Sequence, residues 1–138
     1  MADNLSCTVV TPAQTVFAGE ATYVGLPGEL GGFGVMKGHE PFVSTLTAGV
    51  VNIKPVEGGK DVRYIVAGGY AQVDDNAIIV LADNAVDLSK VDVQAIKAEL
   101  EQVEESLKGI PEGDASRAYY LDQKNWLNLQ LGSVSAAE

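Results

Sequence analysis

Alternation between apolar and polar residues dominates the first two thirds of the chain. In residues 5–11, Leu5, Cys7 and Val9 occupy every second position, which places their side chains on one face of a β-strand. Similar runs follow at intervals of about 8–12 residues, a spacing typical of an antiparallel sandwich or barrel. Further strands are predicted at 16–18, 22–26, 33–36, 42–46, 48–54, 62–66, 70–73 and 77–82.

Turn residues separate these runs. Pro27-Gly28 and Asp74-Asp75-Asn76 are strong turn signals, and Gly58-Gly59 predicts a hairpin between two β-branched runs. Gly19-Glu20 predicts a further turn, and Gly68-Gly69 predicts a bulge or a sharp bend where two backbones approach. The first part of the chain is therefore expected to form an antiparallel β-sandwich of about ten short strands.

The pattern changes at Leu88 to the period of an α-helix. Ser89-Lys90-Val91-Asp92 matches a capping box with Asp in place of Glu, and Gly109 and Pro111 end the predicted helix. Between these signals, one narrow apolar stripe recurs at spacings of three and four residues and is expected to pack on the second helix or on the sandwich. Its members are Val93, Ile96, Leu100, Val103 and Leu107.

A second helix is predicted to begin after Asp114, its expected N-cap, and to end near Gly132 with a frayed tail over 133–138. Its apolar residues do not fall on one stripe, so this helix needs more than one partner. Two helices joined by a short loop form an αα-hairpin. The predicted organisation is a β plus α fold, with a β-sandwich domain at 1–87 and a helical hairpin domain at 88–138.

Charge and cysteine content narrow the classes of function. The 138 residues carry 9 basic and 19 acidic side chains, a net charge of −10, which disfavours nucleic acid and anionic membrane surfaces and favours protein partners. Cys7 is the only cysteine, so an internal disulfide and a cysteine metal cluster are excluded, and we expect Cys7 to be a small core residue. The N-terminus lacks the pattern of a signal peptide and no apolar run has the length of a membrane span, so a cytoplasmic location without direct membrane insertion is expected.

The glycine-rich stretch at 28–41 is a candidate phosphate-binding loop. A Walker loop requires Ser or Thr after its lysine, but Lys37 is followed by Gly38 and His39. A dinucleotide fingerprint that starts at Gly32 would need a third glycine at position 37. We therefore expect neither a nucleotide nor another cofactor at this loop.

His39 is the only histidine, so a Ser-His-Asp triad would have to use it, and a multi-histidine metal site is impossible. A hydrolase would need Ser44 or Ser6 as its nucleophile, and neither lies in a recognisable nucleophile elbow. The alternative is a turn histidine whose ring nitrogens bond to nearby backbone, and this interpretation is favoured because the sequence supplies no second catalytic partner. The acidic residues of the first predicted helix lack the order of a calcium loop and are expected to form a solvated face, so no metal site is predicted.

Three stretches in order resemble the epsilon subunit of F-type ATP synthases, which is called delta in mitochondria. Gly34-Val35-Met36-Lys37-Gly38-His39-Glu40-Pro41 is similar to the family's glycine-histidine-proline loop. Val66-Ala67-Gly68-Gly69-Tyr70-Ala71-Gln72-Val73 is similar to its double-glycine strand, and Val80-Leu81-Ala82-Asp83-Asn84-Ala85 to its Leu-Ala-Asp strand end. Two positions depart from the family: Gly32 stands where bacterial members often place an acid, and Ala48 replaces a proline.

The resemblance implies a two-sheet sandwich, a helical hairpin and a non-catalytic role in the rotor stalk. The implied partners are the gamma subunit, the membrane c-ring and the catalytic alpha and beta subunits, and the implied role is to couple ion flow to ATP synthesis. The implied location is the cytoplasmic face of the cell membrane, held peripherally through the complex. The expected contacts with the c-ring or gamma are Glu29, Lys37, Gly38, His39 and Glu40.

In many bacterial relatives the hairpin binds ATP or inhibits hydrolysis. The relatives' motif is an apolar residue, Asp, two variable residues, Arg and Ala; here Asp92 is kept but Ala95 replaces the arginine. The second helix offers only Arg117 and Lys124 as cations, and phosphates need more positive charge than that. We expect no tight ATP binding and at most weak inhibition. Two other functions stay open: a small β-sandwich protein-binding module with a helical appendage, and a hydrolase that uses His39.

Overall fold

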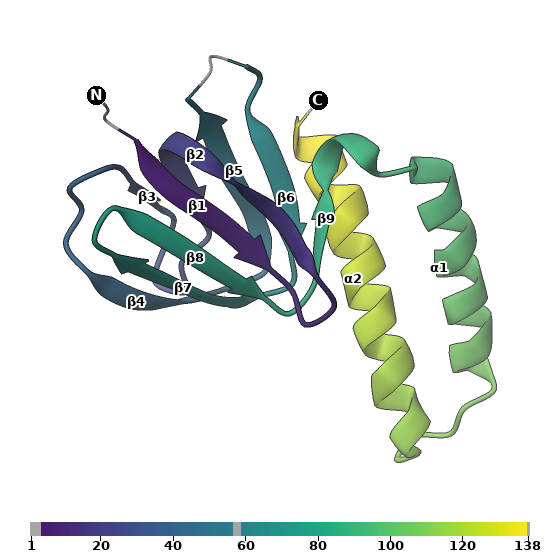
Figure 1. Ribbon diagram of the computed structural model, residues 1–138. Helices are drawn as coiled ribbons and strands as arrows, with labels where there is room; N and C mark the ends of the chain where they lie inside the picture. Colours follow the sequence, from purple (N-terminus) through teal and green to yellow (C-terminus); the bar gives the residue numbers. More distant parts are fainter. Residues whose placement is uncertain (1–3, 57–58, 138) are drawn as a thin grey trace. The chain divides into compact units, whose positions relative to one another are not determined.

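The computed structural model describes residues 4–56 and 59–137 (Figure 1). The chain divides into two compact units, residues 1–87 and residues 88–138. All strands belong to the first unit and both α-helices to the second.

The first unit is an open β-sandwich, as predicted. Its sheet has the order β4-β7-β8-β1-β2-β5-β6-β9, and β3 pairs with β2 outside this path. The pairing of β1 with β8 is parallel, and the other pairings are antiparallel. The described residues contain nine strands where about ten were expected: β1 (Leu5–Val10), β2 (Thr15–Leu26), β3 (Phe33–Val35), β4 (Phe42–Leu46), β5 (Gly49–Pro55), β6 (Val62–Val66), β7 (Gly69–Asp74), β8 (Ala77–Ala82) and β9 (Ala85–Asp87).

Strand β2 is one long element and connects the two layers of the sandwich. Its first half pairs with β1, and its second half pairs with β5 and β3. The register with β5 shifts between Ala21 and Tyr23, where the strand changes layer. The prediction of a turn at Gly19-Glu20 was therefore wrong. Both residues lie in the β1–β2 ladder opposite Cys7 and Ser6, so long-range pairing overrides the local turn signal.

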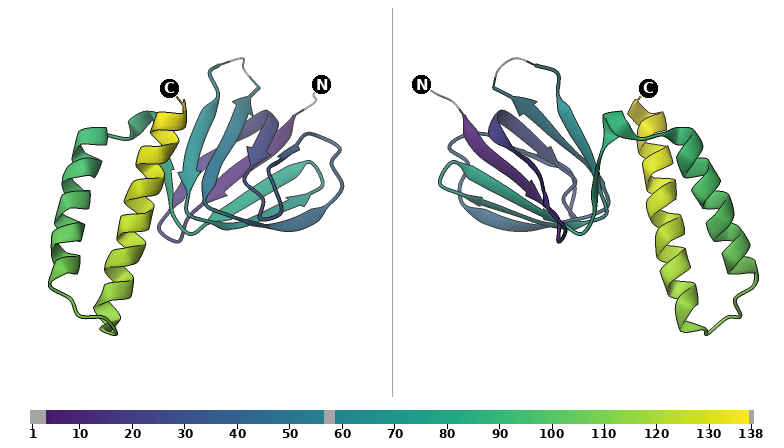
Figure 2. Two further views of the ribbon diagram at one scale, coloured as in Figure 1. Left: turned by 180° about the vertical axis from the view of Figure 1, so that it is seen from behind. Right: turned by 45° about the vertical axis from the view of Figure 1, so that its right-hand side comes forward.

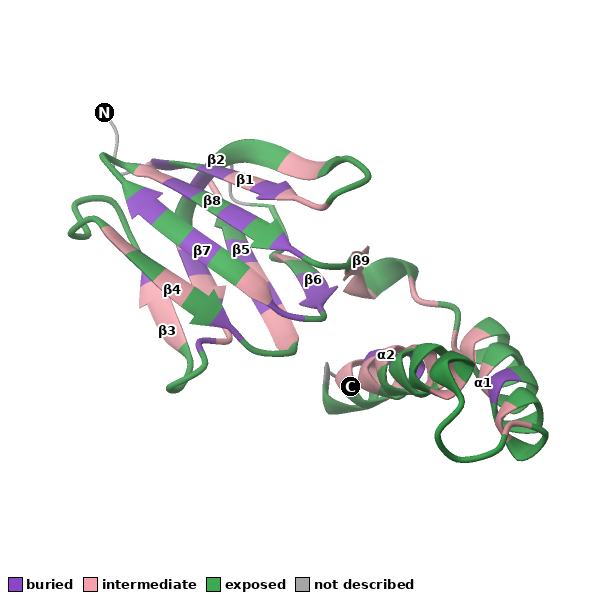
Figure 3. Cartoon of the chain, turned by 90° about the horizontal axis from the view of Figure 1, so that it is seen from below, coloured by how far each residue is buried: buried purple, intermediate pink, exposed green. Residues whose placement is uncertain are grey.

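Alternating side chains form the core of the sandwich. Leu5, Cys7 and Val9 of β1 are fully buried, as are Ile78 and Val80 of the adjacent strand β8 (Figure 3). Burial raises the pKa of the Cys7 thiol to about 12, so this residue is a neutral core side chain at physiological pH. The prediction that Cys7 is a core residue is confirmed.

Two of the predicted turns have the expected backbone. Asp75 and Asn76 have φ angles of 48° and 65° and connect β7 to β8. Gly68 and Gly69 have φ angles of 118° and 141° and form a sharp bend between β6 and β7. A Cβ atom at Gly69 would overlap the carbonyl oxygen of Leu81, so two backbones approach closely there, as predicted. Strands β5 and β6 form the predicted hairpin, although Gly58 lies outside the described residues.

The second unit contains a short 3₁₀ helix, η1 (Leu88–Lys90), and two helices, α1 (Val93–Lys108) and α2 (Ala115–Ala137). The predicted capping box was wrong. Ser89 belongs to η1, and Asp92 itself is the N-cap of α1, where its Oδ1 accepts a hydrogen bond from the Ala95 N–H at 3.1 Å. A 3₁₀ turn occupies the predicted cap position, so the N-cap of α1 is Asp92 and not Ser89.

Helix α2 begins where it was predicted and ends later. Asp114 accepts hydrogen bonds from the N–H and the hydroxyl of Ser116, at 3.0 and 2.8 Å, and so caps the helix. The predicted end near Gly132 and the frayed tail were wrong, because α2 continues to Ala137. One glycine costs only about 1 kcal/mol in a helix, and the Ser133 hydroxyl bonds back to the Leu129 carbonyl within the same helix.

Helices α1 and α2 lie antiparallel, side by side (Figure 2). The predicted apolar stripe of α1 is its least exposed side, and Val103 at its centre is only 7% exposed. On α2, Leu127 is buried to a similar extent. Two cations add to this packing: Arg117 donates to the carbonyls of Leu107 and Ile110, and Lys124 lies 3.6 Å from Glu104.

Candidate functional site

The glycine-rich loop is tied to strand β4 near one end and to the β7–β8 turn near the other. At the first end, Gly28 forms an isolated bridge with Leu46, and the Glu29 N–H donates to the Thr45 carbonyl at 3.0 Å. At the other end, the Gly38 N–H donates to Oδ1 of Asn76 at 3.1 Å. Asn76 lies in the β7–β8 turn, next to the start of β4. The loop is therefore exposed but anchored.

His39 is a turn residue. Its Nδ1 lies 2.9 Å from the Glu40 carbonyl oxygen, so Nδ1 carries the hydrogen and donates it to backbone. The ring also packs against Phe42, with 4.8 Å between ring centroids. Ser44, one of the two candidate nucleophiles, donates its hydroxyl to the Thr45 carbonyl. This arrangement agrees with the turn-histidine interpretation and gives no support to a hydrolase that pairs His39 with Ser44.

The five predicted interface residues fall into two groups. Lys37, Gly38, His39 and Glu40 are exposed just before β4 begins, whereas Glu29 is exposed beside Thr45 near its end. At about 3.3 Å per residue, Phe42 and Thr45 are roughly 10 Å apart, so the structure does not gather all five residues at one point.

Two exposed apolar side chains of this loop were missed by the sequence analysis. Leu30 is as exposed as in an extended chain, and Met36 is 60% exposed. Met36 lines an open depression together with Thr22, Lys37 and Gly38. An apolar residue inside a turn is the sequence signal that could have identified Leu30.

A second exposed surface lies on the outer side of β4, β7 and β8. We call it the outer patch, and it consists of Val43, Tyr70, Ile79 and Leu81, which are 67%, 56%, 42% and 46% exposed. The strand register brings these residues together: Tyr70 is opposite Leu81, and Gln72 is flanked by Val43 and Ile79. In Figure 3, exposed and buried positions alternate along β7 and β8.

A hollow of about 270 Å³ lies at one end of the outer patch. Tyr70 and Leu81 line it together with Val10 and Pro12 of the β1–β2 connection, and the remaining lining residues are Thr11, Ala82 and Asp83. The sequence contained a signal for this surface. The run 77–82 is apolar at every position, so β8 is apolar on its outer face as well as its inner face.

The hairpin residues that match the nucleotide motif have structural roles. Asp92 caps α1, Arg117 binds carbonyls at the end of α1, and Lys124 pairs with Glu104. Among the residues that the structure describes, no group of three or more His, Cys, Asp or Glu side chains could hold a metal ion. Within that same part of the chain, neither α-helix combines the length and the apolar character needed to cross a bilayer.

Comparison with known proteins identifies close sequence relatives. The profile of the family described as "ATP synthase, Delta/Epsilon chain, beta-sandwich domain" matches residues 4–88. The ATP synthase epsilon chain of Anaeromyxobacter dehalogenans is 39% identical over 114 residues, which are 83% of this chain and 85% of the relative. The ATP synthase epsilon chain of Hyphomonas neptunium is 38% identical over 130 residues, which are 92% and 93% of the two chains.

Two solved structures share the fold. A chain of the Euglena gracilis mitochondrial ATP synthase, from a structure of OSCP, F1 and the c-ring, has a TM-score of 0.68 at 20% identity, and the match covers 99% of this chain and 82% of that one. A chain from the central stalk and c-ring of the Tetrahymena thermophila mitochondrial ATP synthase has a TM-score of 0.58 at 15% identity, with coverage of 94% and 95%. At these identities the likeness concerns the fold, including the sandwich and the hairpin.

Proposed function

The chain belongs to the family of ATP synthase delta and epsilon chains, and we propose that it is a non-catalytic rotor subunit that couples ion flow through the c-ring to ATP synthesis by way of gamma. The resemblance expected from its sequence motifs is thereby confirmed. The proposal rests on this family match together with two separate exposed surfaces of the sandwich, the outer patch and the glycine-rich loop. The proposed location is the cytoplasmic face of the membrane, through the complex.

The outer patch is the proposed surface for gamma. Single exposed apolar residues are ordinary, but four that adjoin across three strands suggest a protein interface. Tyr70, at the end of the patch beside the hollow, is an aromatic residue of the kind enriched in such interfaces, and the hollow can receive a side chain of the partner. The patch carries no charged member, which favours a buried contact between subunits.

The glycine-rich loop is the proposed surface for the c-ring. It presents Leu30 and Met36 as apolar contacts, with Glu29, Lys37, His39 and Glu40 as the surrounding polar side chains. The anchoring bonds at Gly28, Glu29 and Gly38 reduce the conformational entropy that the loop loses on binding. A rotor subunit needs such a surface because it must transmit torque through contacts that hold their shape.

The proposal is tested by co-purification with the assembled synthase, using a matched pair of variants. Leu81→Asp adds a charge to the outer patch, whereas Leu121→Asp adds the same charge at a leucine of similar exposure on α2. Leu81→Asp should lose co-purification with gamma while its circular dichroism stays unchanged, and Leu121→Asp should keep it. Equal retention of both variants would overturn the assignment of the outer patch to gamma.

The c-ring assignment is tested by cross-linking. Cys7 is buried, so a single cysteine introduced at His39 or Met36 should be the reactive thiol among the described residues. Cross-links from these positions should reach the c subunit, and a control cysteine at exposed Asp61 should not. Capture of only the catalytic subunits would contradict the orientation. If the chain were instead a free-standing binding module, neither gamma nor the catalytic subunits would co-purify with it.

For the hairpin we propose at most a weak regulatory role and no tight ATP binding. Its two candidate phosphate ligands, Arg117 and Lys124, already bind α1, and releasing them would cost those contacts. Trp126, the only tryptophan, lies on α2 and reports on this unit. Titration with ATP should leave its fluorescence unchanged, and calorimetry should detect no saturable binding at micromolar ATP; saturable binding would contradict the proposal.

A further inference from the structure

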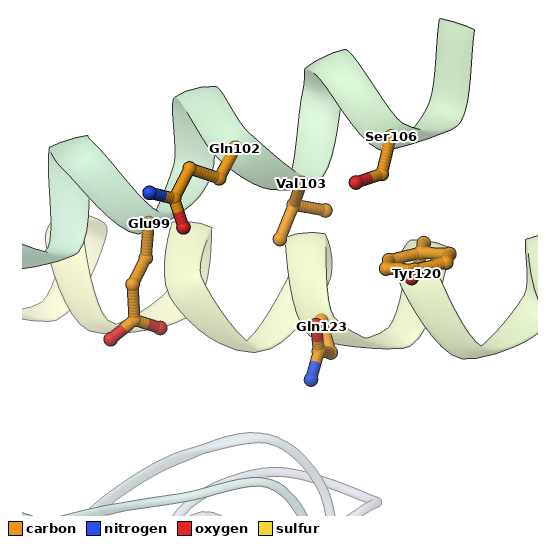
Figure 4. A pocket seen from close by; sticks show the side chains of 6 residues that line it. All are labelled: Glu99, Gln102, Val103, Ser106, Tyr120 and Gln123. Atoms are coloured by element: carbon orange, nitrogen blue, oxygen red, sulfur yellow. The ribbon is translucent and has the colours of Figure 1, made fainter. Parts of the chain in front are cut away.

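An open pocket of about 290 Å³ lies between the two helices of the hairpin (Figure 4). Val103 forms its apolar part and is buried, whereas the other lining residues carry polar groups. In Figure 4 the Glu99 carboxylate lies at one end, and Tyr120 and Ser106 lie at the other. The full lining set is Glu99, Gln102, Val103, Ser106, Tyr120 and Gln123.

The lining is rich in hydrogen-bond acceptors, and none of the described residues that form it is a cation. Glu99 supplies a carboxylate, and the side chains of Gln102 and Ser106 supply further oxygens on the same face of α1. The Nε2 of Gln123 donates to the Tyr119 hydroxyl at 2.9 Å, so the carbonyl oxygen of that amide stays available. Tyr120 adds a half-buried aromatic ring, and aromatic faces attract cations.

The two flanks of the helix–helix contact differ in charge. Glu104 lies about 140° around α1 from Glu99, because five residues at 100° each make 500°. On that flank, Lys124 neutralises Glu104 at 3.6 Å. On the pocket's flank, no Lys or Arg among the described residues forms an ion pair with Glu99. The carboxylate of Glu104 is therefore paired with a cation, whereas the carboxylate of Glu99 lies in an acceptor-lined pocket and has no such ion pair with a described residue.

We propose that this pocket binds an organic cation, the guanidinium of an arginine or the ammonium of a lysine that belongs to a partner chain. The pocket offers a carboxylate, two amide oxygens and a hydroxyl, all of which accept hydrogen bonds. These acceptors match a positively charged group with several N–H donors. The pocket is close to the smallest volume usual for ligand sites, which suits one side chain better than a cofactor.

The openness of the site favours a side chain of a partner over a free small molecule. Glu99 is exposed and is the only charged group in the lining, so its attraction for a free cation is weak. A cation on a chain already docked elsewhere benefits from an effective concentration in the millimolar range. This assignment of the source depends on the proposed membership of a multisubunit complex, whereas the selectivity for a cation does not.

The first experiment uses the full-length chain by itself. Backbone amide resonances are followed during titration with N-acetyl-arginine amide, and with N-acetyl-citrulline amide as a neutral analogue of the same shape. We expect shifts confined to the pocket, centred on Ser106 and Gln123, for the arginine derivative alone. Glu99→Gln should weaken this binding about three- to fivefold, as expected for loss of one exposed charge pair.

A matched variant separates the pocket from the general negative charge. Glu101→Gln removes a carboxylate of the same type from the opposite side of α1 and should leave the titration unchanged. Equal weakening by both variants, equal binding of citrulline, or shifts spread over the surface would each overturn the cation pocket.

The second experiment identifies the source of the cation. Assembled synthase is prepared with Glu99→Gln or with Glu101→Gln, and release of the chain is measured as the salt concentration rises. Release of the Glu99→Gln chain at lower salt than the Glu101→Gln chain supports a partner's side chain, and identical release refutes that source. If instead the wild-type chain failed to enter the complex, the function proposed above would be wrong, while the titration of the isolated chain would still decide the cation pocket.

Discussion

Gly69→Ala should destabilise the sandwich far more than an alanine at another glycine with positive φ. Gly69 lies at the bend between β6 and β7 with φ of 141°, and an added Cβ would overlap the Leu81 carbonyl oxygen. That carbonyl belongs to β8, which pairs with β7 along six residue pairs. The neighbouring atoms are backbone within the sheet, so they cannot move aside as a flexible side chain would.

Two costs add at this position. A non-glycine residue at positive φ costs about 1–3 kcal/mol, and forcing strands apart to fit a methyl group costs about a further 1–3 kcal/mol. We therefore expect Gly69→Ala to lose about 2–6 kcal/mol, a large part of the stability of a small domain. The matched control is Gly38→Ala, where φ is 88° but no atom lies within 4 Å of the added Cβ. Only the first cost applies there, so the expected loss is about 1–3 kcal/mol.

The assay is denaturant unfolding of the full-length chain, followed by far-UV circular dichroism. Tryptophan fluorescence is unsuitable because Trp126 lies on α2, outside the sandwich. The two midpoints should differ by an amount that corresponds to the steric cost of about 1–3 kcal/mol, with a similar slope m for both variants. If both variants lost the same free energy within about 0.5 kcal/mol, the steric argument at Gly69 would be refuted.

Three further predictions concern the two units separately. Residues 1–87 alone should give a cooperative, strand-rich melt, because every strand lies within them; a truncated chain that is unfolded would contradict this. Val103→Ala should destabilise the hairpin by about 1.5–2.5 kcal/mol, since it removes two buried methyl groups, and Leu121→Ala, at an exposed position of α2, should cost less; the reverse order would refute the assigned packing. The hydrogen bonds from Ser116 lower the pKa of Asp114, so its stabilising effect should be complete above the ordinary aspartate value near about 4 and be lost as the pH falls through the lower folded-state pKa. The difference in hairpin melting temperature between wild type and Asp114→Ala should accordingly be constant from neutral pH to about pH 5 and vanish in strong acid; a difference that grows in acid would give the opposite sign and reject the cap.

Local signals in the sequence correctly predicted several locally determined features, although the capping box at Ser89 and the helix end near Gly132 were wrong. The Asp74-Asp75-Asn76 turn, the Gly68-Gly69 bend and the start of α2 at Asp114 all lie where residue type predicts them. The stripe of α1 was predicted for a similar reason, because a helix repeats its own geometry every few residues.

Another error arose where residues distant in the sequence determine the structure. Gly19-Glu20 has the residues of a turn, but its backbone groups are used by β1, which the local sequence does not specify. The outer patch is a related case. The run 77–82 is apolar on both faces, so its sequence alone does not show which face lies in the core. The register with β4 and β7 shows that one face packs in the core and that Val43 and Tyr70 lie beside the other.

The residues that identify the family are mainly residues that build the fold, and this explains why the family was easier to predict than the contacts. Gly69 permits the approach of β7 to β8, and the Gly38 N–H ties the loop to Asn76 in the β7–β8 turn. His39 bonds to backbone within its own turn and packs on Phe42. Such residues are constrained whatever the partner is. The side chains proposed to meet gamma need only be apolar and outward-facing, so many sequences satisfy this requirement. Val43 and Ile79 accordingly lie outside the three stretches that resemble the family, although Tyr70 and Leu81 lie within them. Variants at Gly69 and at Leu81 should consequently fail in different ways: the first should lose stability in the isolated chain, and the second should keep its stability and lose only its partner.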